Sequence, residues 1–255
     1  MRISDAGTVM ADKQLGLILL SGGLDSTTAA AWAIDHGMTV SAVSFDYGQT
    51  HRRELQSATE VAKRLDLKHS VVDVTFYREL AAHSALTKPE SLALPTGRST
   101  TDMSADIPST YVPLRNTFFM TMAAAWLESE ALSAIENDGV APDDLSATLI
   151  IAANAIDYSG YPDCRPEFYN AIAESLRLGS KLGTQYAVPF SIATPLIELT
   201  KADIVKLALE LNAPLETTWS CYDSQDVPCG ICDSCLLRAK GFAEAKARDP
   251  ALQPK

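Results

Sequence analysis

The stretch LGLILLSGGLDSTTAAAWAID, residues 15–35, decides how this chain folds. Residues 15–20 are apolar apart from one glycine, a composition typical of a strand that is buried on both faces. Residues 27–34 are rich in alanine and predict a helix. A strand, a short turn and a helix in this order form one unit of a parallel α/β sheet. We expect the rest of the domain to be arranged around this unit.

The turn between this strand and this helix has the sequence SGGLDS, residues 21–26. Its two glycines allow the backbone to approach a ligand closely, and the free N–H groups and dipole at the start of the helix attract an anion. The hydroxyl groups of Ser21, Ser26 and Thr27 add further donors. The turn therefore predicts a phosphate site, although by itself it also fits an ordinary turn with a serine cap.

Composition and charge limit the kind of protein that this is. The chain has 255 residues, of which 47% are apolar, so it can bury the core of one large α/β domain with a small appendage. No apolar run approaches the roughly 20 residues of a membrane-spanning helix. Residues 1–14 lack the apolar core of a secretory signal. The net charge of −11 argues against a broad nucleic-acid surface. We expect a cytoplasmic protein that binds neither membranes nor nucleic acid.

Alternating strand and helix patterns continue along the chain. Strands are predicted at residues 39–45, 68–74 and 148–153, with a short strand end at 192–196. Helices are predicted at residues 52–65, 116–130, 166–178 and 200–211. The last helix has a Thr200-x-x-Asp203 capping pattern. This alternation predicts a Rossmann-like parallel sheet with right-handed crossovers and helices on both faces.

The remaining segments predict how the chain is divided. Residues 82–109 are rich in Ser, Thr, Pro and Asp and predict a long loop or lid, and residues 136–146 predict an exposed connector. We expect an N-terminal extension over 1–14, an α/β domain over 15–212, and a cysteine-bearing region with a closing helix over 213–255.

Four of the five cysteines lie close together in the last part of the sequence. They follow the spacing C-x7-C-x2-C-x2-C at Cys221, Cys229, Cys232 and Cys235. Four thiolates at this spacing can close a tetrahedral shell around Zn²⁺, and such closed shells are structural. Because no export signal is visible, a metal is favoured over disulfides. A redox pair, a persulfide site and an iron–sulfur cluster are the alternatives. Cys164 stands apart and is expected to be a small buried residue.

The residues of the glycine turn exclude two common nucleotide motifs. No lysine follows the last glycine, as one does in the P-loop, and the third glycine of the dinucleotide fingerprint is missing. The turn instead resembles the SGGxDS pyrophosphate loop of the N-type ATP pyrophosphatases, which split ATP between its α and β phosphates. The resemblance implies that the loop holds the leaving pyrophosphate, with Asp25 beside Mg²⁺. It assigns ATP binding to Leu20, Ser21, Gly22, Gly23, Leu24, Asp25, Ser26, Thr27, Phe45 and Asp46.

Further motifs narrow the resemblance to one family. Together, the glycine turn and the four cysteines resemble those of the 7-cyano-7-deazaguanine synthases, over residues 15–242. The same resemblance is carried by FDYGQ at 45–49 with His51, YVPLRN at 111–116, DYSGYPDCR at 157–165, TPL at 194–196 and WSCY at 219–222. Leu24 departs from the pattern, because many members carry glutamine there, but this is the variable position of the loop.

This family takes 7-carboxy-7-deazaguanine, ATP and ammonia to a nitrile, a precursor of queuosine. The resemblance implies that the carboxylate is first adenylated, that ammonia displaces AMP to give an amide, and that a second activation dehydrates the amide. Adenylation is needed because hydroxide would otherwise have to leave. The resemblance also implies a homodimer, and we see no glutaminase-like segment, so we expect free ammonium to be used.

The resemblance, together with the position of each motif, predicts roles for single residues. Arg115 is expected to clamp a phosphate or the substrate carboxylate, with a surface ion pair as the alternative, and Lys201 to reach the triphosphate. With Asp25 and Ser26 they form the expected catalytic set. Aromatic rings can stack on the deazapurine, and a carboxylate can pair with its guanine-like edge. Substrate binding is therefore expected from Tyr47, Gln49, Asp157, Tyr158, Tyr161, Asp163 and Arg165.

Two other functions fit part of the sequence. A tRNA thiolase with the same loop would need a tRNA surface and a catalytic cysteine pair near the site. The net charge of −11 disfavours a tRNA surface. A zinc-bearing sensor would bind adenine nucleotide without chemistry. Pyrophosphate release with 7-carboxy-7-deazaguanine and ammonia separates the three functions. Release that depends on tRNA favours the thiolase, and binding without turnover favours the sensor.

Overall fold

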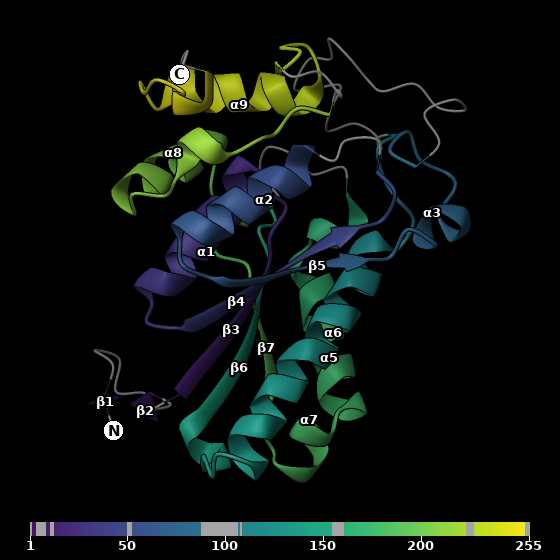
Figure 1. The fold of residues 1–255 in the computed structure, drawn as a ribbon, viewed down its shortest axis with the longest axis vertical. Coiled ribbons are helices and arrows are strands. Elements are labelled where there is room, and N and C mark those ends of the chain that lie inside the picture. Colours follow the sequence, from purple (N-terminus) through teal and green to yellow (C-terminus); the bar gives the residue numbers. More distant parts are fainter. Residues whose placement is uncertain are drawn as a thin grey trace.

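The protein is built on a five-stranded parallel sheet (Figure 1). The computed structural model describes residues 2–3, 9–10, 13–49, 53–87, 107, 109–154, 161–222 and 227–252. The strands of the sheet are β3 (Lys13–Leu19), β4 (Thr39–Asp46), β5 (Lys68–Asp73), β6 (Leu145–Ile150) and β7 (Phe190–Ala193). Two short strands, β1 (Arg2–Ile3) and β2 (Val9–Met10), pair antiparallel in a separate ribbon.

The strand order is β5-β4-β3-β6-β7, so β3 lies at the centre. The chain first adds strands on one side of β3 and then returns to add β6 and β7 on the other side. Leu17 of β3 is thus in register with Ser41 of β4 and with Leu149 of β6. The reversal places a topological switch point between β3 and β6, and open α/β sheets bind ligands at the carboxyl edge of such a point.

Helices cover both faces of the sheet, as the sequence predicts (Figure 1). One face is covered by α1 (Leu24–Asp35), α2 (Arg53–Arg64) and α8 (Lys201–Glu210), with α9 (Asp233–Glu244) packed on α8. The other face is covered by α5 (Arg115–Glu136), α6 (Pro166–Gly179) and α7 (Lys181–Gln185). The short α3 (Tyr77–Leu80) follows β5. Short 3₁₀ turns occur at Pro142–Asp144, Pro162–Cys164, Leu215–Thr217 and Pro250–Leu252.

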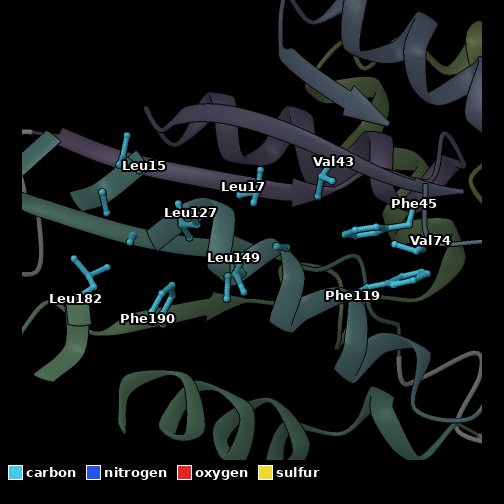
Figure 2. Close-up of a cluster of buried hydrophobic side chains, with 14 of the residues drawn as sticks. Leu15, Leu17, Val43, Phe45, Val74, Phe119, Leu127, Leu149, Leu182 and Phe190 are labelled. Atoms are coloured by element: carbon cyan, nitrogen blue, oxygen red, sulfur yellow. The ribbon is translucent and has the colours of Figure 1, made fainter. Parts of the chain in front are cut away.

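The apolar run in β3 supplies both cores because its side chains alternate between the two faces. Leu15 and Leu17 belong to the cluster on the α5 side, where they lie with Phe119, Leu127 and Leu149 (Figure 2). Ile18 belongs to the opposite cluster, with the alanines of α1. Leu17 and Ile18 are fully buried, and each contributes about 1.5–3 kcal/mol of hydrophobic stabilisation. The prediction of a strand buried on both faces is therefore confirmed.

Several element boundaries differ from those predicted. The strand predicted at residues 148–153 begins at Leu145, which is in register with Lys13, so β3 includes the last two residues of the predicted extension. The helix predicted to end at residue 130 continues to Glu136, because Ala131 and Ala134 keep its buried face apolar. The strand end predicted at residues 192–196 stops at Ala193. Pro195 follows two residues later, and proline lacks the N–H that a strand ladder needs.

The long segment 82–109 is described only at its two ends. There, the backbone N–H of Ala85 donates to the carbonyl oxygen of Ser109 at 2.8 Å, and the hydroxyl of Thr87 donates to the carbonyl of Ala81 at 2.7 Å. Residues 88–106 lie outside the described residues. No described helix has both the length and the apolarity that a bilayer span needs.

Candidate active site

A cleft of about 400 Å³ opens at the carboxyl edge of the sheet. Its wall is formed by residues just after β3, β4 and β6 and by the first turns of α1, α2, α5 and α8. A volume of this size is typical of small-molecule sites. The helix N-termini that converge here favour an anionic ligand.

The glycine turn is held tightly between α2 and the cysteine-bearing region. Gly22 has φ of +81°, and a Cβ at this position would stand 2.5 Å from the carbonyl oxygen of Glu54 and 2.4 Å from the nitrogen of Ala58. Only glycine fits this conformation and this close approach. The Gly22 carbonyl accepts a hydrogen bond from the N–H of Trp219 at 2.9 Å. These contacts hold the loop in its shape.

The two serines of the turn have different surroundings. The hydroxyl of Ser26 is buried, donates to the Gly23 carbonyl at 3.3 Å and accepts from the Ser21 N–H at 3.2 Å. The Ser21 hydroxyl lies 3.0 Å from that of Ser26 and accepts from the Gly23 N–H at 3.3 Å. Ser26 thus fastens the turn, while the exposed Ser21 presents its hydroxyl at the cleft.

Asp25 and Lys201 form an ion pair at the floor of the cleft. The Lys201 Nζ donates to the two carboxylate oxygens of Asp25 at 2.9 and 2.7 Å. Their side chains are only 28% and 11% exposed. Lys201 is the first residue of α8, whose start is capped by Thr200, because the Thr200 hydroxyl accepts from the N–H of Asp203 at 3.2 Å. The capping pattern predicted from the sequence is confirmed.

Arg115 begins α5 and also lines the cleft. It follows Leu114, which has φ of +53°, a left-handed conformation that is uncommon for a residue with a side chain. Burial lowers the pKa of Arg115, but Tyr47, Tyr161 and Asp163 outweigh this effect and raise it above its usual value. Its guanidinium carbon lies 5.8 Å from the Tyr47 ring centroid. No described carboxylate lies within 4.0 Å to pair with it, so its charge faces the cleft.

Aromatic residues form the wall after β4. Phe45 stacks on Phe119 with ring centroids 4.4 Å apart, and Tyr47 lies 5.5 Å from the same ring. Burial raises the pKa of Tyr47, so its hydroxyl stays protonated. Gln49 accepts from the Tyr47 N–H at 2.9 Å and donates to the Phe45 carbonyl at 3.4 Å. The amide of Gln49 therefore holds this loop in place.

The structure brings most of the predicted residues together but separates some of them. Of the predicted set, those that line the cleft are Leu20, Ser21, Gly23, Leu24, Asp25, Ser26, Phe45, Tyr47, Gln49, Arg115, Tyr161 and Lys201. Gly22, Thr27, Asp46, Asp163 and Arg165 are not among the described residues that line it. His51, Asp157, Tyr158 and Ser159 lie outside the described residues.

The predicted substrate loop places its two ends in different surroundings. Tyr161 lines the cleft, and its hydroxyl lies 2.8 Å from that of Thr110. Asp163 is buried and does not line the cleft; burial raises its pKa, and one of its carboxylate oxygens has no hydrogen-bond partner among the described residues. Arg165 is exposed at the start of α6.

Several cleft residues were missed by sequence reasoning. Glu54 lies in the first turn of α2, and burial raises its pKa to about 7, an effect opposed by Arg115 and reinforced by Cys232. The position of α2 gives a signal for it, since a helix that follows β4 starts at the carboxyl edge. Arg238 of α9 also lines the cleft and binds Asp249 through two hydrogen bonds, at 2.6 and 2.9 Å. Its Nη1 donates to the hydroxyl of Ser220 at 3.0 Å.

The four clustered cysteines meet beside this cleft, as the spacing predicts. The sulfur atoms of Cys221, Cys229, Cys232 and Cys235 all lie within 4.8 Å of one another. Sulfurs bound to a tetrahedral Zn²⁺ at about 2.3 Å are about 3.8 Å apart, so the cluster fits a metal ion after a small contraction. The backbone N–H groups of Cys229 and Cys232 donate to the sulfurs of Cys221 and Cys229 at 3.3 and 3.4 Å. Hydrogen bonds of this kind stabilise thiolates.

The cysteine cluster is coupled to the glycine turn through Trp219. The indole N–H of Trp219 donates to the Cys221 carbonyl at 3.0 Å, and its backbone N–H donates to the Gly22 carbonyl. Trp219, Ser220 and Tyr222 all line the cleft. A metal held by the cysteines would therefore fix one wall of the site.

The fold and the site together define the class of the protein. A parallel sheet with a lysine-free glycine turn at its carboxyl edge is the arrangement of the PP-loop proteins, the superfamily of the N-type ATP pyrophosphatases. A family model described as "Queuosine biosynthesis protein QueC" matches residues 16–246. The chain belongs to this family.

Several 7-cyano-7-deazaguanine synthases are similar in sequence to this chain over almost its whole length. The 7-cyano-7-deazaguanine synthase of Thermoplasma acidophilum is 45% identical over 94% of this chain and 92% of its own. That of Nostoc punctiforme is 46% identical over 92% of this chain and 98% of its own. The synthase of Desulfatibacillum aliphaticivorans is 46% identical over 93% of this chain and 96% of its own. The family resemblance drawn from the motifs is confirmed.

Proposed function

We propose that this protein converts 7-carboxy-7-deazaguanine and ammonium to 7-cyano-7-deazaguanine at the expense of ATP, which it splits to AMP and pyrophosphate. One observation carries the proposal. A single cleft holds a tightly packed glycine turn, the Asp25–Lys201 pair and an arginine that pairs with no carboxylate of the described residues, in a chain of this family. Such a set can hold a triphosphate and a carboxylate side by side.

The first activation follows from these positions. The glycine turn and the start of α1 bind the β and γ phosphates, Lys201 neutralises charge on the leaving group, and Asp25 offers oxygen ligands to Mg²⁺. The backbone at the end of β4, at Phe45 and Asp46, holds the adenine. Arg115 holds the substrate carboxylate so that one of its oxygens attacks the α phosphorus. A new P–O bond forms as the bond to pyrophosphate breaks.

Two displacements complete the reaction. Ammonia attacks the acyl carbon, AMP leaves with the oxygen, one proton is released from nitrogen, and the product is an amide. A second ATP then transfers AMP to the amide oxygen. The carbon–oxygen bond breaks, the oxygen leaves as part of AMP, and the nitrogen loses its two protons to give the nitrile. The deazapurine ring stacks on Tyr47 and Tyr161, and Gln49 supports Tyr47.

We assign Zn²⁺ to the cysteine cluster, where four thiolates leave no position open for substrate. Its part is structural, since it fixes the wall formed by Trp219 and its neighbours. We further propose free ammonium as the nitrogen source, a homodimer, and a cytoplasmic location, where cysteines stay reduced.

The test is a reaction of the purified protein with 7-carboxy-7-deazaguanine, MgATP and ammonium chloride. We expect pyrophosphate and AMP in equal amounts, and a nitrile product identified by its mass. Absence of ATP cleavage under these conditions contradicts the proposal. Cleavage that requires added tRNA indicates a thiolase, and nucleotide binding without turnover indicates a sensor.

A further inference from the structure

Glu54 brings a carboxylate into the cleft from the side of the glycine turn. It lies in the first turn of α2, and its carbonyl oxygen packs against Gly22, 2.5 Å from the position that a Cβ there would take. Its side chain is partly buried and lines the cleft. This turn of α2 therefore lies against the glycine turn, and the side chain of Glu54 lines the same cleft.

Among the described residues, the Glu54 carboxylate has no partner. Within the described part of the chain, no donor forms a hydrogen bond or ion pair with Glu54, whereas Asp25, the other acidic residue that lines the cleft, is paired with Lys201. A partly buried carboxylate without a partner is costly. Its position therefore points to a ligand that is cationic or donates hydrogen bonds.

The groups around Glu54 show which part of the cleft it serves. The charge of Arg115, at the start of α5, lowers the pKa of Glu54, and Cys232, just before α9, raises it. Glu54 in turn raises the pKa of Tyr47, which directly follows β4. Burial outweighs the other effects and raises the pKa of Glu54 to about 7. Near neutral pH the group can thus both accept and release a proton, which suits general acid–base chemistry.

The position beside Arg115 decides between two ligands. A carboxylate could bind the guanine-like edge of the deazapurine or an ammonium ion. The guanine-like edge lies on the six-membered ring, at the far end of the bicycle from the carboxylate on the five-membered ring. Glu54 is close enough to Arg115 for the arginine to change its pKa, and its turn of α2 packs against the glycine turn. If Arg115 holds the substrate carboxylate, Glu54 therefore faces the reacting carbon. Ammonium is the reactant that needs an anionic partner there.

We propose that Glu54 binds the ammonium ion and takes the proton that makes it a nucleophile. This inference rests on the proposed function and adds a catalytic residue to it. One N–H bond of ammonium breaks and its proton goes to the Glu54 carboxylate, which leaves uncharged ammonia. The nitrogen lone pair forms the bond to the acyl carbon as the carbon–oxygen bond to AMP breaks, and the nitrogen, now cationic, releases a second proton to water to give the neutral amide. Glu54 then returns its proton to water at the mouth of the cleft.

The variant Glu54→Gln tests this role because it keeps the shape of the side chain and removes its charge. We expect kcat/KM for ammonium to fall about 100-fold or more, while KM for ATP and for 7-carboxy-7-deazaguanine stay within about twofold. Glu60→Gln is the matched control, since Glu60 lies on the same helix and pairs with Arg64 on the surface. The control should keep the wild-type values.

Hydroxylamine separates proton removal from other roles of Glu54. It is uncharged at neutral pH and needs no base, so Glu54→Gln should form the hydroxamate from the adenylated acid at close to the wild-type rate. An equal loss with hydroxylamine and ammonium shows a positioning or structural role and overturns the proposal. A raised KM for the deazapurine acid with unchanged ammonium kinetics shows that Glu54 binds the ring, and this also overturns it. If the wild-type protein releases no pyrophosphate, the proposed function fails first.

Discussion

Lys201 and Asp25, 176 residues apart in the sequence, meet at the cleft through two hydrogen bonds of 2.7 and 2.9 Å. The pair joins the first turn of α1 to the first residue of α8. A bound MgATP would offer both groups other partners, since magnesium prefers carboxylate oxygens and lysine binds phosphate as a point charge. The pair therefore holds the two side chains in place until the nucleotide arrives.

Replacement of Asp25 should remove activity without removing the metal. We expect Asp25→Ala to lower pyrophosphate release by about 100-fold or more, because the magnesium ligand is lost and the phosphate charge is poorly balanced. Zinc content should stay at one ion per chain, since the Asp25 side chain pairs with Lys201 rather than with the cysteines. Asp35→Ala, at the exposed end of the same helix, is the control. Elemental analysis that finds metal loss in Asp25→Ala would show that the two sites are not separate.

Gly241 should be needed for the position of Lys201. A Cβ at Gly241 of α9 would stand 2.5 Å from Cγ of Lys201 and 3.0 Å from its carbonyl oxygen. Gly241→Ala should push the lysine away from Asp25 and lower kcat/KM for ATP by about 10- to 100-fold. The added methyl should also cost about 1–3 kcal/mol of stability through overpacking. Steady-state kinetics and thermal unfolding check both effects.

Gly179 provides the comparison for this variant. It ends α6, and a Cβ there would meet no atom within 4 Å. Gly179→Ala should leave activity unchanged and keep or slightly raise stability, because alanine reduces the freedom of the unfolded chain. Equal losses in both variants would mean that the effect at Gly241 is not specific to Lys201.

The sequence predicted the fold and the cysteine cluster because both depend on local patterns. The apolar run of β3, the alanine-rich α1 and the cap at Thr200 are short-range features, and each is confirmed. The cysteine spacing also confines four sulfurs to one small region. These features needed no knowledge of how distant segments pack.

The composition of the cleft was harder to predict because it depends on where side chains face. Asp163 and Tyr161 are two residues apart, yet Asp163 is buried and does not line the cleft, whereas Tyr161 lines it. Glu54 and Arg238 carry no motif of their own and reach the cleft only because α2 and α9 pack against the glycine turn and α8. Their roles follow from packing, which periodicity does not encode.

Removal of the metal should loosen the wall that contains Trp219. Cys221→Ser or treatment with a strong chelator breaks the four-sulfur shell, and the bond from the Trp219 indole to the Cys221 carbonyl should be lost with it. We expect weaker ATP binding, a lower melting temperature and a red shift of tryptophan fluorescence as this buried ring meets water. The loss of stability should be large, because structural zinc sites contribute about 10 kcal/mol or more of binding energy to folding.

Cys164 is the internal control for the metal. It lines the cleft away from the cluster, and burial raises its pKa to about 12, so no thiolate is available at neutral pH. Cys164→Ser should therefore keep the metal and the fluorescence spectrum. A full complement of zinc in Cys221→Ser, or iron in the wild-type protein, would contradict the assignment.

Acid should destabilise the protein partly through His69. This residue of β5 places Nε2 2.8 Å from the Ser44 hydroxyl, which itself donates to the Leu20 carbonyl at the edge of the cleft at 2.5 Å. Because the Ser44 hydroxyl donates its own proton to the Leu20 carbonyl, it accepts from Nε2, which therefore carries a proton. Burial lowers the pKa of His69 below the value of about 6.5 that an unfolded chain has. The contribution is therefore complete above about pH 6.5 and is lost as the pH falls toward the folded-state pKa.

The variant His69→Gln isolates this effect, because an amide can still donate to Ser44 but does not titrate. We expect its free energy of unfolding to fall less steeply than that of the wild type between about pH 6.5 and pH 5. His36→Gln, at the exposed end of α1, should keep the wild-type slope. Urea titrations at several pH values give these slopes. If His69→Gln and the wild type lose stability in parallel, His69 does not carry the dependence.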